Sequence, residues 1–266
     1  MALDLETSLV AICSAGDLDR LKALLPSGCE TPSEEIIQDL LNAAARNSKL
    51  DVVNFLLEQY PTVRLNEEIV RGSIYTRSIA IFNALLARDP AIINMRFDMR
   101  GTPLIVACQS QQDVDYLRTL LEAGADPNID PDTSIYPIAL VASLGGYTDA
   151  AAIDLLLRHG ARPEGTGALA YAAMNGKDAV VLSLLKAGAC PQAEANAAPG
   201  GYYATPSPLH AAVIHGHESV VGLLLEYGAD PNAVDNKGLT ATDHAMQMSR
   251  DGKNVSSIID ILENQG

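Results

Sequence analysis

One short pattern recurs along the chain, and it constrains the fold more than any other feature of the sequence. In each copy a polar residue is followed by an apolar residue, a pair of small residues, a glycine or polar break, and then an apolar doublet or triplet. The copies begin at Thr7, Asp39, Glu68, Thr102, Tyr136, Gly167 and Ser207, with a degenerate last copy at Thr240. Recurrence every 29 to 40 residues indicates an array of stacked units.

The copy SPLHAAVIHGHESVVGLLLEYGADPN, at residues 207–232, predicts two helices and two stops. Ser207 is suited to the N-cap, and Pro208 fills the first helical position, where its missing N–H costs nothing. Gly216 ends the first helix, and Gly228 supplies the positive φ that ends the second. The second helix carries too many apolar residues for one stripe, so neighbouring units must cover both its sides. Such units are stable only when stacked.

These segments resemble ankyrin repeats, in which a TPLHxAA helix precedes a Gly break and a VVxLLLxxGA helix. The fourth, sixth and seventh copies match closely, whereas the second and third lack the TPLH residues and the GAD turn. The resemblance implies an all-α ankyrin-repeat solenoid with short hairpin or finger turns and a concave groove. It predicts a single array over residues 1–266, with units near residues 4–36, 37–65, 66–96, 97–130, 131–163, 164–191, 192–234 (insertion 191–206) and a C-terminal cap at 235–266.

The second unit carries its own start signal. Thr31, Pro32, Ser33 and Glu34 spell a capping box with Pro at the first helical position. The acidic pairs Glu34/Glu35 and Glu67/Glu68 fall at helix starts, where the helix dipole favours anions. We therefore interpret these carboxylates as structural rather than as acid–base catalysts.

Charge narrows the classes of partner. The chain has 18 Lys and Arg against 33 Asp and Glu, a net charge of −15, divided as −9 over residues 1–133 and −6 over residues 134–266. Binding of nucleic acid or anionic lipid requires clustered Lys and Arg, which the sequence lacks. The composition therefore predicts no nucleic-acid or membrane partner, and favours a protein partner with a basic or neutral surface.

Cysteine usage and hydropathy bear on the compartment. Cys13, Cys29, Cys108 and Cys190 show no CxxC spacing, and the N-terminal residues do not form a secretory signal. No apolar run approaches the roughly 18 residues of a membrane span. These features predict free thiols and an intracellular protein, cytoplasmic and/or nuclear.

Three segments depart from the regular repeat. Residues 191–206 form the longest insertion, which carries the adjacent Tyr202 and Tyr203. Residues 94–101, NMRFDMRG, place an apolar and basic cluster before the fourth repeat. Residues 161–167 are too short for a full finger, so the groove is expected to be interrupted there. Insertions in repeat proteins often carry function, so residues 191–206 are expected to reach over the groove.

In ankyrin-like arrays, ligands usually lie against the finger turns and the exposed face of the first helices. Carried over to this sequence, that surface falls mainly in the central and C-terminal half, where Leu144, Met174, Ile214 and Met248 are unusually apolar for a solvent face. The predicted partner-binding residues are Tyr75, Met99, Arg100, Tyr136, Leu144, Met174, Tyr202, Tyr203, Ile214, His215, Lys237 and Met248.

The histidines are interpreted by their place in the repeat. The family's capping position falls on His210, which can bond the Ser207 hydroxyl, and His217 follows the Gly break, so both are expected to be structural. His215 is expected to face the groove as a contact residue. No third ligand converges on His215 and His217, and Asp243 and His244 would face different directions on a helix. No metal site, cofactor or catalytic residue is predicted.

Two functions remain open from the sequence. The leading one is a non-catalytic interaction scaffold or adaptor, monomeric, that binds a protein through its concave face and finger loops. The alternative is a small-molecule binder, or an unconventional enzyme with acid–base chemistry in a groove pocket under residues 195–206. No hydrolase, kinase, metalloprotease or nucleotide-binding motif is present, which favours the scaffold.

Overall fold

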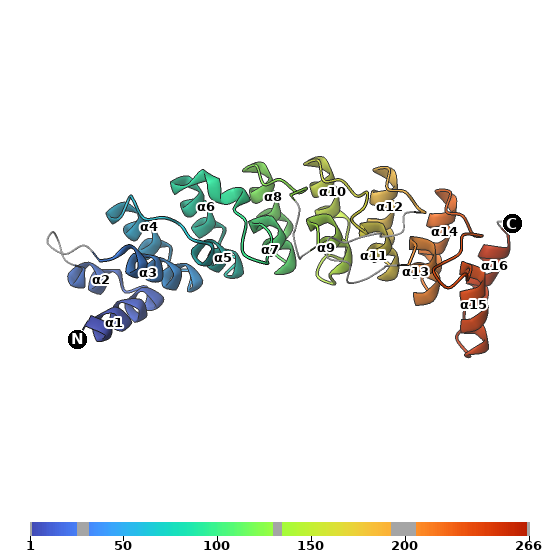
Figure 1. The fold of residues 1–266 in the computed structure, drawn as a ribbon, viewed down its shortest axis with the longest axis horizontal. Coiled ribbons are helices and arrows are strands. Elements are labelled where there is room, and N and C mark those ends of the chain that lie inside the picture. Colours follow the sequence, from blue (N-terminus) through green and yellow to red (C-terminus); the bar gives the residue numbers. More distant parts are fainter. Residues whose placement is uncertain (1, 26–31, 130–134, 193–205, 265–266) are drawn as a thin grey trace. The chain divides into compact units, whose positions relative to one another are not determined.

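The computed structural model describes residues 2–25, 32–129, 135–192 and 206–264, with side chains from Thr7 onward. Within these ranges sixteen α-helices follow one another in pairs (Figure 1). The first eight are α1 (Ala2–Ala15), α2 (Leu18–Leu24), α3 (Glu34–Arg46), α4 (Leu50–Gln59), α5 (Glu67–Tyr75), α6 (Ile79–Arg88), α7 (Pro103–Gln109) and α8 (Val114–Glu122). The others are α9 (Pro137–Ser143), α10 (Ala151–Arg158), α11 (Ala168–Met174), α12 (Asp178–Lys186), α13 (Pro208–His215), α14 (Glu218–Glu226), α15 (Ala241–Arg250) and α16 (Ser256–Glu263).

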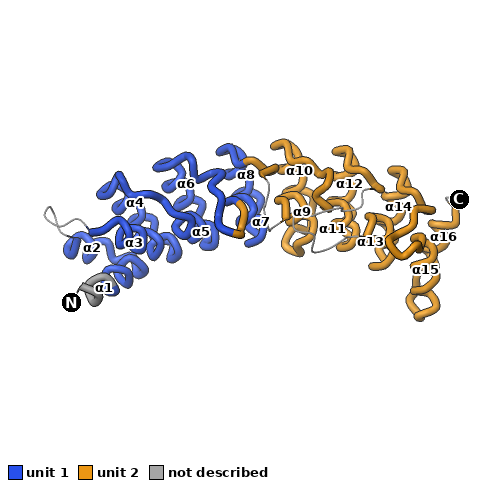
Figure 2. Tube along the Cα trace, viewed as in Figure 1, with its two compact units in different colours: residues 1–98, 102–125 blue, residues 99–101, 126–266 orange. Residues whose placement is uncertain are grey.

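The helices group into two compact units (Figure 2). Unit 1 holds residues 1–98 and 102–125, and unit 2 holds residues 99–101 and 126–266. In unit 1 the first helices α1, α3, α5 and α7 pack against one another in order, and α4 packs on α6. In unit 2 the first helices α9, α11, α13 and α15 form one layer, and α10, α12, α14 and α16 form the other. The expectation of a single array stays a prediction.

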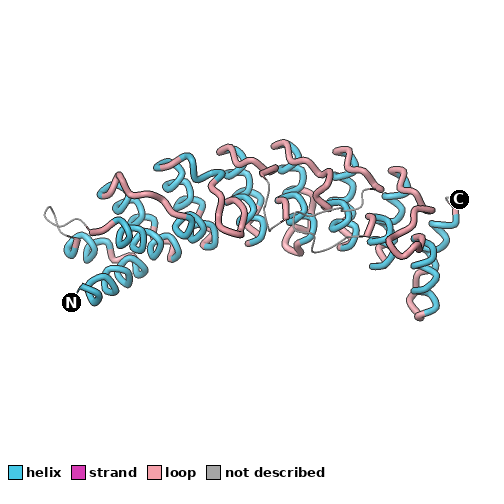
Figure 3. Tube along the Cα trace, viewed as in Figure 1, coloured by secondary structure: helices cyan, strands magenta, loops and turns pink. Residues whose placement is uncertain are grey.

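The predicted all-α class is confirmed by these helices. Figure 3 shows helices joined by loops, and no β-strand is assigned in the described ranges. A single bridge between Val234 and Thr240 closes the turn between α14 and α15, as expected for a short finger. No helix of the described chain is both long and apolar enough to cross a membrane.

The seventh repeat forms as its sequence predicts. The Ser207 hydroxyl caps α13 by accepting from the backbone N–H of His210, and Pro208 follows at the first helical position. Gly216 ends α13 with φ +76°, and Gly228 ends the next helix with φ +88°. A residue with a Cβ adopts such angles only under strain, which explains glycine at both stops.

The core of this repeat depends on its neighbours. Ala211 and Ala212 of α13 are fully buried, as are Val220, Val221 and Leu224 of α14. Helix α14 packs on α12 at one side and on α16 at the other. Its apolar residues are therefore covered from two directions, which confirms the expectation that neighbouring units cover this helix.

The second repeat starts differently from the prediction. Ser33 is the N-cap of α3 and accepts from the backbone N–H of Ile36, so Pro32 lies before the helix rather than at its first position. Thr31 lies outside the described residues. The prediction failed because two hydroxyl residues precede the same acidic pair, and the cap fell on the nearer one. The pairs Glu34/Glu35 and Glu67/Glu68 do occupy first helical turns, as expected.

Consecutive repeats are joined by a side chain that follows the break between the two helices of a pair. Gln112 donates to the Ile74 carbonyl (2.7 Å), Lys177 to the Leu144 carbonyl (2.6 Å), and His217 to the Met174 carbonyl (2.9 Å). Each bond is made to a carbonyl at or directly after the C-terminal end of the preceding first helix, where carbonyls lack the partners of a helix interior. His217 was predicted to be structural, and its bond to the Met174 carbonyl is such a role. Burial lowers the pKa of Lys177.

The segment at residues 94–101 divides between core and surface. It follows the 3₁₀ helix η1 (Pro90–Asn94). Phe97 is buried, so this part of the apolar and basic cluster belongs to the core, whereas Met99 is 72% exposed. Of the four cysteines, Cys13, Cys108 and Cys190 are free thiols, and Cys29 lies outside the described residues. Burial raises the pKa of the Cys13 thiol to about 12.

Candidate binding pocket

A pocket of about 270 Å³ lies in unit 2, between the turns that precede α13 and α15. Because these turns are separated by one whole repeat, stacking is what brings the walls together. We call it the finger pocket. Its lining residues are Pro191, Gln192, Pro206, Ser207, Leu209, His210, Ile214, Ala229, Asp230, Ala233, Val234, Asp235, Asn236, Lys237 and His244.

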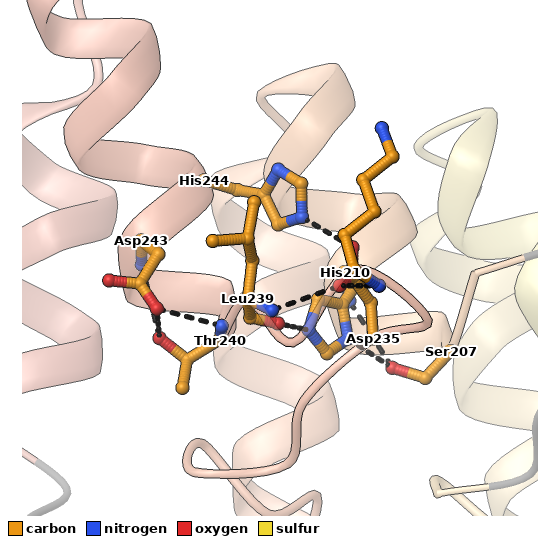
Figure 4. Close-up of polar contacts among 8 residues, drawn as sticks. Ser207, His210, Asp235, Leu239, Thr240, Asp243 and His244 are labelled. Atoms are coloured by element: carbon orange, nitrogen blue, oxygen red, sulfur yellow. Dashed lines mark hydrogen bonds and ion pairs between the residues drawn. The ribbon is translucent and has the colours of Figure 1, made fainter.

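The N-terminal end of α13 is tied to the following finger through His210 (Figure 4). The Nε2 atom of His210 donates to the Leu239 carbonyl (3.1 Å), because a carbonyl oxygen can only accept. In the neutral imidazole, Nδ1 then accepts from the Ser207 hydroxyl at 2.7 Å. His210 is buried, and both its ring nitrogens are engaged. The predicted bond between His210 and Ser207 is confirmed, and this imidazole acts as a tie.

Asp235 organises the finger itself. Its carboxylate accepts from the backbone N–H groups of Lys237 (2.8 Å) and Leu239 (3.0 Å), and from Nε2 of His244 (2.8 Å). The side chain of Asp235 is 11% exposed. The Leu239 N–H and the His244 imidazole, with the Lys237 N–H, hold the pKa of the Asp235 carboxyl well below its usual range. The finger is therefore built around an ionised carboxylate.

Asp243 and His244 are adjacent in sequence but serve different partners. Asp243 accepts from the backbone N–H and hydroxyl of Thr240, which completes a capping box at the start of α15. His244 donates instead to Asp235, on the other side in Figure 4. The expectation that the two side chains face different directions is confirmed. The Thr240 bonds also lower the pKa of Asp243.

The two imidazoles that line the pocket are held by hydrogen bonds within the chain. Both nitrogens of His210 are engaged, and Nε2 of His244 is held by Asp235, so the lining imidazoles hold the finger together. No group of three His, Cys, Asp or Glu in the described chain could hold a metal ion. The pocket offers a ligand the apolar side chains of Leu209, Ile214 and Val234 beside polar groups.

The structure brings two of the predicted contact residues into this pocket and leaves the others elsewhere. Ile214 and Lys237 line it. His215 is exposed on the last turn of α13, outside the lining, and its ring stacks on His217 with centroids 6.3 Å apart. In unit 2, Tyr136, Leu144, Met174 and Met248 are half-buried outside the pocket. Contact with a partner stays a prediction for all of them.

The remaining predicted contact residues lie far along the sequence from the pocket or beyond the description. Tyr75 at the end of α5 is 47% exposed, and Met99 and Arg100 are exposed in the turn before α7. Tyr202 and Tyr203 lie outside the described residues. Partner contact by these five residues is likewise a prediction.

Several lining residues were missed by sequence reasoning. Leu209, Asp230 and Val234 line the pocket, and none of them was among the residues that the sequence predicts to bind a partner. His244 and Asp235 were not paired. The available signal was the aspartate nine residues before His244, in a turn that precedes the same helix. A finger that folds back on its helix brings such a pair together.

Paired helices in two layers, glycine stops and hydrogen-bonded fingers define the class of helical repeat proteins. The family model described as "Ankyrin repeat" matches residues 101–131 and 207–236. Ankyrin repeat protein nuc-2 of Neurospora crassa is 28% identical over 251 residues, which cover 90% of this chain and 22% of that protein. The chain thus spans about a fifth of the length of this relative.

A solved structure supports the same assignment. An ankyrin repeat domain from Acinetobacter baumannii superimposes with a TM-score of 0.62 at 25% sequence identity, covering 76% of this chain and 99% of that one. The family model, the Neurospora relative and this solved structure together support an ankyrin repeat protein.

Proposed function

We propose that the chain is a protein-interaction module whose finger pocket and adjoining first helices bind a partner polypeptide. Ankyrin repeats generally mediate protein–protein interaction, and family membership supports this function. The observation that carries the proposal is the pocket itself. Its floor contains Leu209 and Ile214, and its rim carries Val234, which is 56% exposed. An apolar depression with a polar rim is typical of the centre of a protein interface.

The size of the pocket favours a protein side chain over a free small molecule. Pockets for drug-sized ligands usually measure roughly 300 to 1,000 Å³. At about 270 Å³ the finger pocket falls just below that range, and it matches one or two inserted side chains. The small-molecule or enzymatic alternative, with a pocket under residues 195–206, is supported only by the lining residues Gln192, shortly before this segment, and Pro206, its last residue.

The charge of the chain supports a partner with a basic or neutral surface. A net charge of −15 raises the local concentration of cationic partners and repels anionic ones. The same charge disfavours nucleic acid and anionic lipid, whose binding depends on basic side chains.

A pair of matched variants tests the proposal. Val234→Glu places a charge on the pocket rim, whereas Tyr227→Glu places the same charge on a 37% exposed aromatic outside the pocket. We expect cell proteins retained by the immobilised chain, measured by quantitative mass spectrometry, to be lost with Val234→Glu and kept with Tyr227→Glu. The interaction is then reconstituted with the purified partner.

Two outcomes would contradict this function. Equal retention by both variants would place the interface elsewhere. Retention of no specific protein, together with thermal stabilisation of the wild-type chain by a metabolite, would support the small-molecule alternative. Melting curves of both variants should match the wild type, because both substituted side chains are partly exposed.

A further inference from the structure

The two carboxylates that line the finger pocket, Asp230 and Asp235, differ in how many of their oxygens already accept hydrogen bonds. Both oxygens of Asp235 accept hydrogen bonds, from two backbone N–H groups and from His244. Asp230 is exposed, and its Oδ1 accepts from the Asn232 backbone N–H at 2.9 Å. Its Oδ2 has no hydrogen-bond or ion-pair partner among the described residues. Asp230 therefore keeps an open acceptor at the pocket.

The positive charges at the pocket are few. In the described part of the chain, Lys237 is the only Lys or Arg that lines it, and its side chain is exposed. Lys237 contributes to the fold through its backbone N–H, which donates to Asp235. Because the whole chain carries −15, the surroundings of the pocket favour a cation over an anion.

The apolar groups lie beside this open carboxylate. Leu209 and Ile214 come from α13, and Ala229 precedes Asp230 directly in the turn after α14. Val234 stands on the finger that forms the opposite wall. A ligand that contacts these apolar side chains therefore occupies a pocket that Asp230 also lines.

From this juxtaposition we propose that the finger pocket recognises an extended partner segment in which an apolar side chain neighbours a lysine or arginine. The apolar side chain occupies the floor beside Leu209 and Ile214, and the cation pairs with the open oxygen of Asp230. This recognition rests on the proposed function, and it specifies the chemistry of the partner. Lys237 repels the partner's cation as a like charge, so it weakens rather than strengthens binding of such a segment.

The test uses the full chain and two sets of synthetic ten-residue peptides. One set carries a leucine next to an arginine at varied positions, and the other carries glutamate in place of the arginine. Affinity is measured by fluorescence anisotropy at low and at high salt. We expect the arginine peptides to bind more tightly, and their advantage to shrink with salt, since partly exposed ion pairs are screened.

Two conservative variants test which charged residue of the pocket contributes to peptide binding. Asp230→Asn keeps an acceptor for the Asn232 N–H, so the turn stays intact while the negative charge is lost. This variant should weaken binding of the arginine peptides by about three- to fivefold, as expected for an exposed ion pair. Lys237→Gln keeps the backbone N–H that bonds Asp235, and should leave binding unchanged or up to about twofold tighter.

The outcomes separate this inference from the proposed function. Tighter binding of the glutamate peptides, with loss of binding on Lys237→Gln, would show that the pocket prefers an anionic partner segment and would overturn the proposal of a cationic one. If neither peptide set binds while a cell protein is still captured in a Val234-dependent manner, the peptide inference is wrong and the interaction function stands. If Asp230→Asn leaves the binding of arginine peptides unchanged, Asp230 is not the anchor.

Discussion

The fourth and seventh repeats start with nearly the same four residues and use them differently. In unit 1, Thr102 to Ile105 reads TPLI, and in unit 2, Ser207 to His210 reads SPLH. Proline fills the first helical position in both. The Ser207 hydroxyl caps its helix and bonds His210, whereas the Thr102 hydroxyl is buried and makes no hydrogen bond with any described residue.

The difference shows which part of the motif forms the fold. Both helices begin at the proline, so the helix start does not depend on the histidine. Ile105 is buried and fills space in the core, but it has no polar atom with which to bond a finger. His210 is equally buried and ties α13 to the Leu239 carbonyl of the next finger. The histidine therefore adds a connection between repeats, and in unit 2 this connection forms one wall of the finger pocket.

The largest effect is expected at a feature that the two repeats share. Gly124 and Gly228 end the second helices of the fourth and seventh repeats at φ +96° and +88°, with no atom within 4 Å of an added Cβ. Valine at either position has space but must adopt a strained backbone, at a cost of about 3 kcal/mol. Urea unfolding should give similar losses for Gly124→Val and Gly228→Val. An unchanged free energy of unfolding at either site would contradict the turn assignment.

The next largest effect is expected from a substitution that makes the seventh repeat resemble the fourth. His210→Ile removes both side-chain bonds and should lower the free energy of unfolding by about 2 kcal/mol, because buried polar groups lose their partners. The control is Ile105→Val, which removes one buried methylene and costs about 1 kcal/mol. If His210→Ile costs less than the control, the tie between α13 and the finger contributes little to stability.

These repeats also show how much the sequence could predict. The helix class, the stops at Gly216 and Gly228 and the bond between Ser207 and His210 rest on residues a few positions apart, so local patterns suffice. The cap of α3 was misassigned because Thr31 and Ser33 offer the same chemistry two residues apart. Local patterns identify a cap, but choosing between adjacent candidates depends on backbone geometry.

The candidate site was less predictable for a different physical reason. Leu209 and Val234 are separated by a full second helix and line the same pocket only because the chain folds back after α14. The bond between His244 and Asp235 likewise depends on the finger folding back onto α15. Register within one repeat singled out Ile214, which lines the pocket, but it gave no information on the facing wall.

A smaller change in stability is expected when the hydroxyl groups of the two N-cap residues, Ser207 and Thr102, are removed. Ser207→Ala removes a cap and a bond to His210, and should cost about 1 kcal/mol. Thr102→Val has nearly the same shape and removes a buried hydroxyl that makes no side-chain cap bond, so stability should stay within about 0.5 kcal/mol or rise. Thermal unfolding of both variants gives the comparison. Equal destabilisation would show that the Thr102 hydroxyl has a partner.

The last comparison concerns the pH dependence of the finger's stability, which is expected to change only at acid pH. The Asp235 carboxyl has a pKa lowered by its donors, whereas the unfolded chain has the ordinary value near 3.9. Its contribution to stability is therefore complete above about pH 5, and is lost as the pH falls below the unfolded pKa toward the folded one. Asp235→Asn should flatten the decline of the unfolding free energy between about pH 5 and 2, relative to the wild type. Asp251→Asn, which removes an exposed carboxylate beyond the end of α15, controls for net charge. Parallel acid declines in the wild type and Asp235→Asn would show that the ionised carboxylate does not stabilise the finger.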